Sequence, residues 1–239
     1  MIWFYAGKKA RLKMKKINIR PKSCWCVARC IALVFTMWQL QGAQILFSNL
    51  VEPGDQYGTD GVSIGDTPAF TTSGDYLLYG VPFTISTTAQ LTMIEAPLGV
   101  ISGPDQIEAF LMTSSGGAPA SVIESFVLTG LPTTPGPYSL FTIDSSLDPV
   151  LMAGQQYWFV ATGGPNTFAS WSLTLFQGDP NDGGASQDVL GGIAQPWSVG
   201  SGTRTGALEV FGNAVPEPSY VALVGCAMLI LALRRKRLR

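Results

Sequence analysis

The chain of 239 residues contains no histidine, and its cysteines and positive charge are almost confined to the two ends. The lack of histidine excludes Ser-His-Asp and Cys-His catalytic sites and histidine-ligated metal sites. All four cysteines lie near the ends, so no disulfide framework supports the central region, residues 44–213. That region also lacks lysine, which excludes a Schiff-base lysine and the phosphate-binding lysine of a P-loop there.

Charge is separated along the chain, so the net charge of -1 is misleading. Of the 15 basic residues, nine lie within residues 8–29 and five within 234–239, which leaves Arg204 alone in the centre. All 16 acidic residues lie between Glu52 and Glu217. The centre is therefore strongly acidic and repels phosphate groups. We expect no binding to nucleic acid.

The N-terminal segment has the order of a secretory signal peptide. Residues 8–22 carry eight basic residues and no acidic one, residues 30–38 are apolar, and small residues follow. We expect export by the secretion machinery and cleavage by signal peptidase after Ala43, which makes residues 1–43 the signal peptide. Met14, followed by two lysines, is an alternative start. Cys24 and Cys26 are interpreted as ordinary apolar residues of this signal.

The centre has the pattern of short β-strands. Glycine and proline interrupt every window before a helical period develops, and Thr, Ser, Val, Ile, Phe and Tyr fill the gaps. Period-two alternation predicts inward-facing side chains in four segments: Val81, Phe83 and Ile85; Ile107, Ala109 and Leu111; Val122, Phe126 and Leu128; Trp171, Leu173 and Leu175. Residues 157–161 are apolar on both faces, which predicts a central strand.

Short strands at regular spacing without helices between them predict an all-β fold. We expect an antiparallel β-sandwich of the jelly-roll or Ig-like kind over residues 44–213, with a barrel as the alternative. About 170 residues can bury a core that needs no disulfides.

With histidine, cysteine and lysine absent from the centre, few residue types that support catalysis remain there. We therefore expect the protein not to be an enzyme. Paired acids such as Asp144 with Asp148, or Glu95 with Glu108, are compatible with glycoside hydrolysis. Their spacing is equally typical of solvated turns and strand edges.

The stretch GDPNDGGASQD places oxygen ligands within one glycine-bearing loop, a pattern that suits a structural calcium ion. Its candidate ligands are Asp179, Asn181, Asp182 and Asp188. The alternative is an ordinary turn, since Asp and Asn followed by Gly are common turn residues. No other cofactor is expected. Trp197 and Tyr57 are candidates for stacking against sugar rings, as in a lectin-like module.

The C-terminal segment, residues 214–239, has three parts in a fixed order. Residues 215–219 read VPEPS, residues 220–233 are apolar, and residues 234–239 read RRKRLR. An apolar helix of 14 residues spans about 21 Å, which is short for a bilayer core of about 30 Å. It can still insert if the basic side chains that flank it reach the interface. The positive charge predicts that this end is cytoplasmic and the centre external.

These three parts resemble the PEP-CTERM sorting signal of Gram-negative bacteria that make exopolysaccharide. The resemblance implies that an exosortase, an integral membrane enzyme, recognises and processes the motif. The recognised residues are Val215, Pro216, Glu217, Pro218 and Ser219, and the basic residues of the stop are Arg234, Arg235, Lys236, Arg237 and Arg239.

The centre also resembles the choice-of-anchor extracellular domains that accompany such signals. The segments that carry this resemblance are PFTIS from Pro82, FVLTG from Phe126 and LMAGQQYWFVATG at 151–163. It implies no activity. We therefore expect a protein exported through the inner membrane, held there transiently, and then sorted to the cell envelope or extracellular matrix. Its expected role is structural or adhesive, in exopolysaccharide or biofilm.

Overall fold

The computed structural model describes residues 42–51, 56–66, 74–133, 140–175, 183–200 and 204–215, together with Val224, Gly225, Ala227, Met228 and Leu231. The described residues before 216 form fourteen strands and one short 3-10 helix, η1 (Gly164–Asn166). The strands are β1 (Gln44–Ser48), β2 (Gly61–Gly65), β3 (Tyr76–Thr84), β4 (Ala89–Ser102), β5 (Ile107–Ser115), β6 (Ala118–Leu128), β7 (Leu140–Asp144), β8 (Val150–Leu151), β9 (Gln156–Thr162), β10 (Phe168–Ser172), β11 (Ala185–Leu190), β12 (Ile193–Ala194), β13 (Ser198–Val199) and β14 (Glu209–Ala214).

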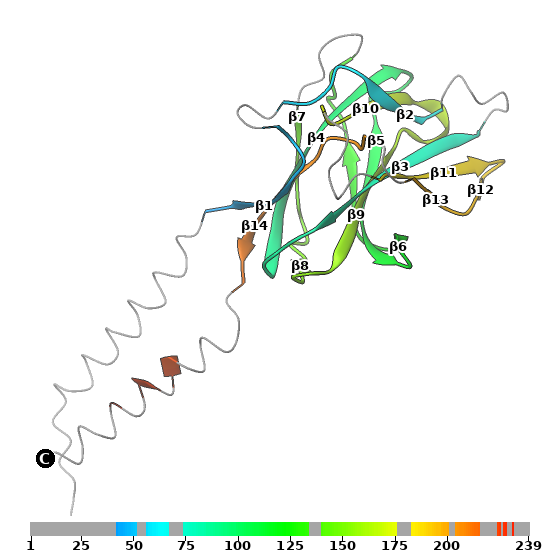
Figure 1. Ribbon diagram of the computed structural model, residues 1–239. Coiled ribbons are helices and arrows are strands. Elements are labelled where there is room, and N and C mark those ends of the chain that lie inside the picture. The colour runs from blue at the N-terminus through cyan, green and yellow to red at the C-terminus, as the bar shows by residue number, and fades with distance from the viewer. Residues whose placement is uncertain are drawn as a thin grey trace, which may run out of the picture. The chain divides into compact units, whose positions relative to one another are not determined.

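The strands form one large antiparallel sheet that curls around the core (Figure 1). Its main path runs β1-β14-β4-β10-β2-β3-β9-β5-β6. The long strand β4 pairs with β14 and then β10 along one edge, and with β8 and β7 along the other. β11 extends the sheet from β3 and carries β12 and β13. The expectation of an all-β antiparallel fold is confirmed.

Strand β9 is central, as its two apolar faces predicted, because β3 and β5 pair with its two edges. Tyr157, Phe159 and Ala161 enter the main core. Trp158 and Val160 point to the other face, where they form a second cluster with Met112 and Ala185. Sheets that bury both faces have strands that read as continuous apolar runs, and β9 has that character.

The inward positions of residues 81–85 and 107–111 are confirmed, since their six predicted side chains are all buried in the main core. The prediction for Val122 is wrong, because 52% of its surface is exposed while Phe126 and Leu128 are buried. Pairing between β5 and β6 skips Ile123, since Glu124 pairs with Leu111 and Val122 with Met112. Such a β-bulge shifts the alternation by one residue and turns the side chains beyond it to the opposite face.

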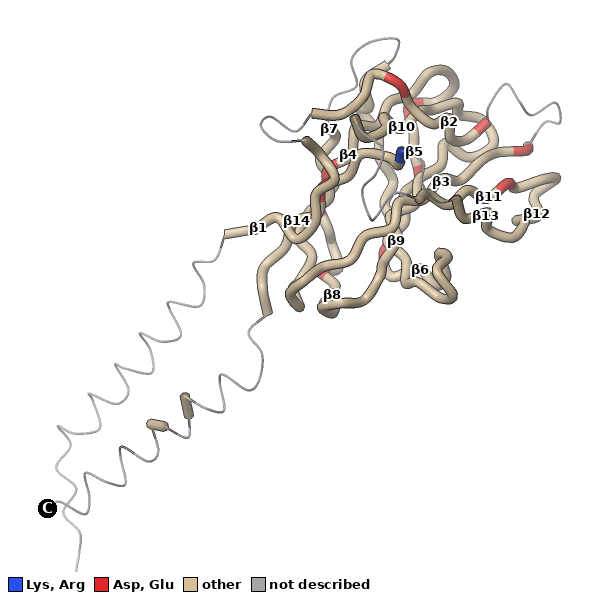
Figure 2. Tube along the Cα trace, in the orientation of Figure 1, with Lys and Arg blue, Asp and Glu red and all other residues tan. Residues whose placement is uncertain are grey.

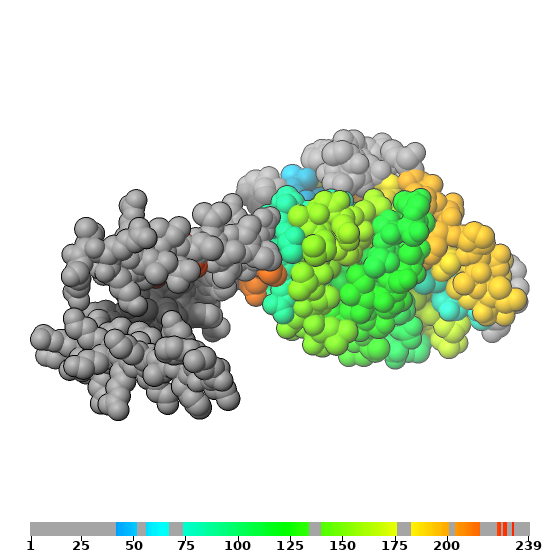
Figure 3. All heavy atoms as spheres, turned by 90° about the horizontal axis from the view of Figure 1, so that it is seen from below, coloured from blue at the N-terminus to red at the C-terminus, as the bar shows by residue number. Residues whose placement is uncertain are grey.

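Strands β1 and β14, far apart in the sequence, lie side by side. Gln44 pairs with Gly212 and Ser48 with Glu209 in an antiparallel ladder. The first residue of β1 therefore lies beside the end of β14. The strands from β1 to β14 make up the β-domain, residues 44–214. Figures 1 and 3 show the pair β1 and β14 at one end of this domain and β11–β13 at the opposite end. The start of β1 and the end of β14 thus lie at the same end of the sheet.

Candidate functional site

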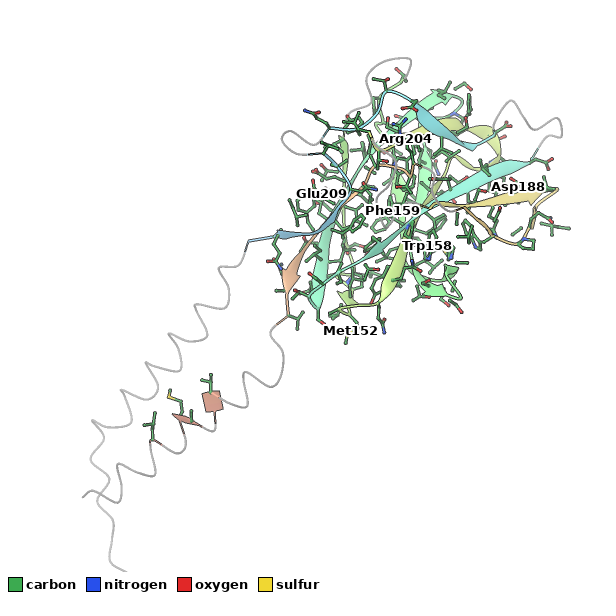
Figure 4. The ribbon with its side chains drawn as sticks, viewed as in Figure 1. Met152, Trp158, Phe159, Asp188, Arg204 and Glu209 are labelled. Carbon is green, nitrogen blue, oxygen red and sulfur yellow. The ribbon has the colours of Figure 1, made fainter. Side chains whose placement is uncertain are left out.

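The predicted calcium ligands fall largely outside the described residues, which omit Asp179, Asn181 and Asp182. Asp188 is exposed and lies on strand β11, where it pairs with Leu77 of β3. The expectation that Asp188 belongs to a loop is wrong, because the free edge of β3 supplies a partner that draws this segment into the sheet. Figure 4 shows Asp188 at the outer end of the domain. Among the described residues, no three Asp, Glu, Cys or His side chains gather as a metal site would need.

The two predicted stacking aromatics are both half-buried. Trp197 packs against the second cluster, which includes Trp158 and Met112. Burial raises the pKa of the Tyr57 hydroxyl above its ordinary value of 10.0. Trp197 therefore covers apolar surface on the outer face of β5 and β9, and its role in glycan stacking stays a prediction.

Of the predicted sorting motif, only Val215 is described. Its backbone N–H donates to the carbonyl oxygen of Thr88 at 2.9 Å, which ties the residue after β14 to the start of β4. Residues 216–219 and the basic residues 234–239 lie outside the described residues, as do most of the apolar residues 220–233. The described residues of that stretch are helical, and no described helix has the length and apolar character to cross a membrane.

Arg204, the one basic residue of the β-domain, is already engaged. Its guanidinium forms an ion pair with Asp60 and donates to the carbonyl oxygen of Thr174. Hydrogen bonding from Arg204 holds the pKa of Asp60 below its ordinary value of 3.8. Figure 2 shows this single blue position among scattered red ones. Because Arg204 already binds a carboxylate, it is a weak candidate for binding an anionic ligand.

Sequence reasoning missed Glu124, whose carboxylate is buried on the inner side of β6. Oε1 accepts from the Ser146 backbone N–H at 2.7 Å, the Ser146 hydroxyl at 3.0 Å and the Leu147 N–H at 3.1 Å. Oε2 accepts from the Ser145 hydroxyl at 2.7 Å. Glu124 thus fastens β6 to the loop after β7. Burial alone raises the pKa of this carboxyl, but the hydrogen bonds outweigh it and leave the pKa below 4.5.

A pocket of about 210 Å³ lies where the turn after β4 and the start of β5 meet the connection from β9 to β10. Exposed polar side chains from Gln106, Glu108 and Asn166 line it, with Pro104 and Pro165 beside them. In the part of the chain that the structure describes, those three polar side chains make no hydrogen bond to the protein. They are therefore free to bind a ligand.

The pocket floor is held by close backbone packing. The Thr167 carbonyl oxygen accepts from the Asp66 N–H at 2.9 Å, and the Thr167 hydroxyl donates to the carbonyl oxygen of Pro104 at 3.0 Å. A Cβ on Gly65 or Gly163 would lie 2.0 or 2.2 Å from the Thr167 carbonyl oxygen. The connection between β9 and β10 therefore sits where only glycines allow neighbouring backbones to approach.

Replacing Gly103 by alanine tests this packing, because its Cβ would lie 2.2 Å from the carbonyl oxygen of Asn166. Gly103 and Gly74 share a φ of +94°, yet the space around Gly74 is open. Gly74→Ala therefore carries the same backbone penalty without the collision. We expect Gly103→Ala to lower the free energy of unfolding by at least about 1 kcal/mol more than Gly74→Ala, measured in urea. Equal losses would contradict the rigid floor.

No family model matches the chain, and a search of curated proteins finds none that is similar.

Proposed function

We propose that the chain is an exported, non-enzymatic surface or matrix protein that an exosortase processes at Val215–Ser219. In this proposal it crosses the inner membrane, stays anchored briefly with its C-terminus in the cytoplasm, and then reaches the envelope or extracellular matrix. There it serves a structural or adhesive role among exopolysaccharide. The observation that carries the proposal is the order VPEPS, apolar stretch and basic end within the last 25 residues.

The arrangement of the β-domain supports this proposal. The pairing of β1 with β14 places the start of β1 and the end of β14 at one end of the domain. A domain built this way can be held at a membrane from that end while its other surfaces face outward. The hydrogen bond from Val215 to Thr88 reaches the first residue of the motif. The segment that the exosortase recognises then starts directly at the boundary of the domain.

The proposal also covers the type of β fold. We describe the curled sheet as a β-sandwich of jelly-roll or Ig-like kind, in which β4, β14 and β7 face β3, β9 and β5. Its support is that Ile94 of β4, Val210 of β14 and Phe159 of β9 share one buried core. Two facing layers over a common core are what a sandwich requires.

The sorting proposal is tested with the double variant Pro216→Ala and Pro218→Ala in the native host. We expect the wild-type protein in the matrix fraction and the double variant at unprocessed mass in the inner membrane. Pro196→Ala is the control, because Pro196 is exposed and lies outside the motif. Matrix localisation of the double variant at wild-type yield would overturn the proposal.

A lectin-like module is the second candidate. The pocket lined by Gln106, Glu108 and Asn166 favours it, since a few convergent polar groups in a concave site are typical of ligand binding.

A further inference from the structure

We infer that the pocket between β5 and the β9–β10 connection binds one sugar residue of a neutral polysaccharide, held by Glu108, Gln106 and Asn166. This inference rests on the proposed function, in that a matrix location supplies the polysaccharide. The site differs from the aromatic residues that sequence reasoning selected, Trp197 and Tyr57.

The polar groups of the pocket match a polyol. The Glu108 carboxylate only accepts hydrogen bonds, and two neighbouring hydroxyls of a sugar ring can both donate to it. The amides of Gln106 and Asn166 donate and accept, so they can serve the remaining hydroxyls and the ring oxygen. These three side chains make no hydrogen bond to any other described residue. Binding a sugar therefore breaks no hydrogen bond among the described residues.

The size of the pocket selects a small ligand. Its volume of about 210 Å³ is below the range of about 300–1,000 Å³ of sites for drug-sized molecules. Pro104 and Pro165 line the pocket and supply apolar surface for the C–H groups of one sugar ring. A single residue within a longer chain fits this description, with the rest of the polymer outside.

Charge selects a neutral ligand. The pocket holds one carboxylate and no basic side chain, and residues 44–215 contain 15 acidic residues against Arg204. A uronic acid would meet repulsion from Glu108 and from the field of the domain. A single carboxylate is also a poor calcium site, because calcium takes six to eight oxygen ligands, several of them commonly carboxylates.

The site is preformed. Thr167 anchors the β9–β10 connection to Pro104 and Asp66, and the Gln106 N–H donates to the carbonyl oxygen of Pro104 at 2.8 Å. A rigid scaffold that presents side chains on loops is the usual way to build a binding site. Little ordering of the backbone is then needed when the sugar binds.

The experiment is saturation-transfer NMR and titration of the purified full-length chain with methyl glycosides of glucose, galactose, mannose and N-acetylglucosamine. Glucuronate and calcium chloride are separate arms. We expect at least one neutral glycoside to bind, and Glu108→Gln and Asn166→Ala each to weaken it by about tenfold or more. Asp144→Asn is the matched control, since Asp144 is an exposed acid on β7 outside the pocket. It should bind as the wild type does.

Three outcomes overturn the inference. One is that none of the four neutral glycosides binds. Another is that the binding is unchanged in both pocket variants, or is lost only in Trp197→Ala. The third is that glucuronate or calcium binds and Glu108→Gln abolishes that binding, which would assign the site to a charged ligand. None of these results depends on C-terminal processing, so failure here is distinct from failure of the sorting proposal.

Discussion

Replacing Trp171 by alanine is expected to lower the free energy of unfolding by about 3–5 kcal/mol, a large part of the about 5–15 kcal/mol that stabilises a typical domain. Trp171 lies on β10 and is fully buried. Its ring makes edge-on contacts with Tyr79 at 5.9 Å and Phe159 at 5.6 Å between ring centroids. Its indole N–H donates to the carbonyl oxygen of Ala207 at 2.8 Å. One side chain therefore joins β3, β9, β10 and the segment before β14.

The matched control is Trp171→Phe, which keeps an aromatic ring but removes the donor to Ala207. We expect it to cost about 1–2 kcal/mol, since a buried carbonyl loses its partner and some volume is lost. Urea unfolding followed by circular dichroism measures both variants. If Trp171→Ala lies within 1 kcal/mol of the wild type, the account of the core is wrong.

Replacing Glu124 by alanine is expected to destabilise the protein by about 2–4 kcal/mol. The substitution removes four hydrogen bonds at once and leaves the N–H groups of Ser146 and Leu147 without their acceptor. The loop after β7 then loses its attachment to β6. Glu124→Gln keeps the shape and an acceptor oxygen but removes the charge. Because charge-assisted hydrogen bonds are roughly twice as strong as neutral ones, we expect about half the loss.

The pH dependence of stability separates charge from shape at Glu124. Its pKa in the folded protein lies below the ordinary value of 4.5. The stabilisation from the charged form is therefore complete above pH 4.5 and is lost as the pH falls through the folded-state pKa. Glu124→Gln should remove this part of the acid sensitivity, measured as the urea midpoint against pH. If the urea midpoint of Glu124→Gln falls at low pH as steeply as that of the wild type, Glu124 does not contribute through its charge.

Strand β9 illustrates what the sequence predicts well. Its apolar residues occupy both faces, and each face is buried in a side-chain cluster, while β3 and β5 pair with its two edges. Here the local pattern and the packing agree, so the pattern alone suffices. Trp158 and Trp171, whose strand positions favoured a place inside, are both buried.

Strand β6 illustrates where sequence reasoning fails. The bulge at Ile123 depends on the register with β5, which no local pattern encodes, so Val122 was placed on the wrong face. Glu124 lies on the same inward face as Phe126 and Leu128, where donors 21 to 23 residues later in the chain satisfy its carboxylate. A buried carboxylate of this kind resembles any other strand acid in the sequence.

The candidate pocket was not predictable for a related reason. Gln106 and Glu108 lie about 60 residues before Asn166, and long-range pairing brings the segments together: Glu108 pairs with Thr162, Ser102 pairs with Phe168, and Thr167 contacts Pro104. The signal that could have pointed to it is the glycines at 65, 103 and 163, each of which permits a backbone contact with Asn166 or Thr167. In the sequence these glycines look like ordinary turn residues.

The central claim is that the C-terminal segment is a processing signal, and the mass of the mature protein from its native host tests it most directly. Intact-mass and peptide mass spectrometry define the last residue of the protein. The proposal predicts an end within Val215–Ser219. A mature protein that retains Arg239 would contradict it.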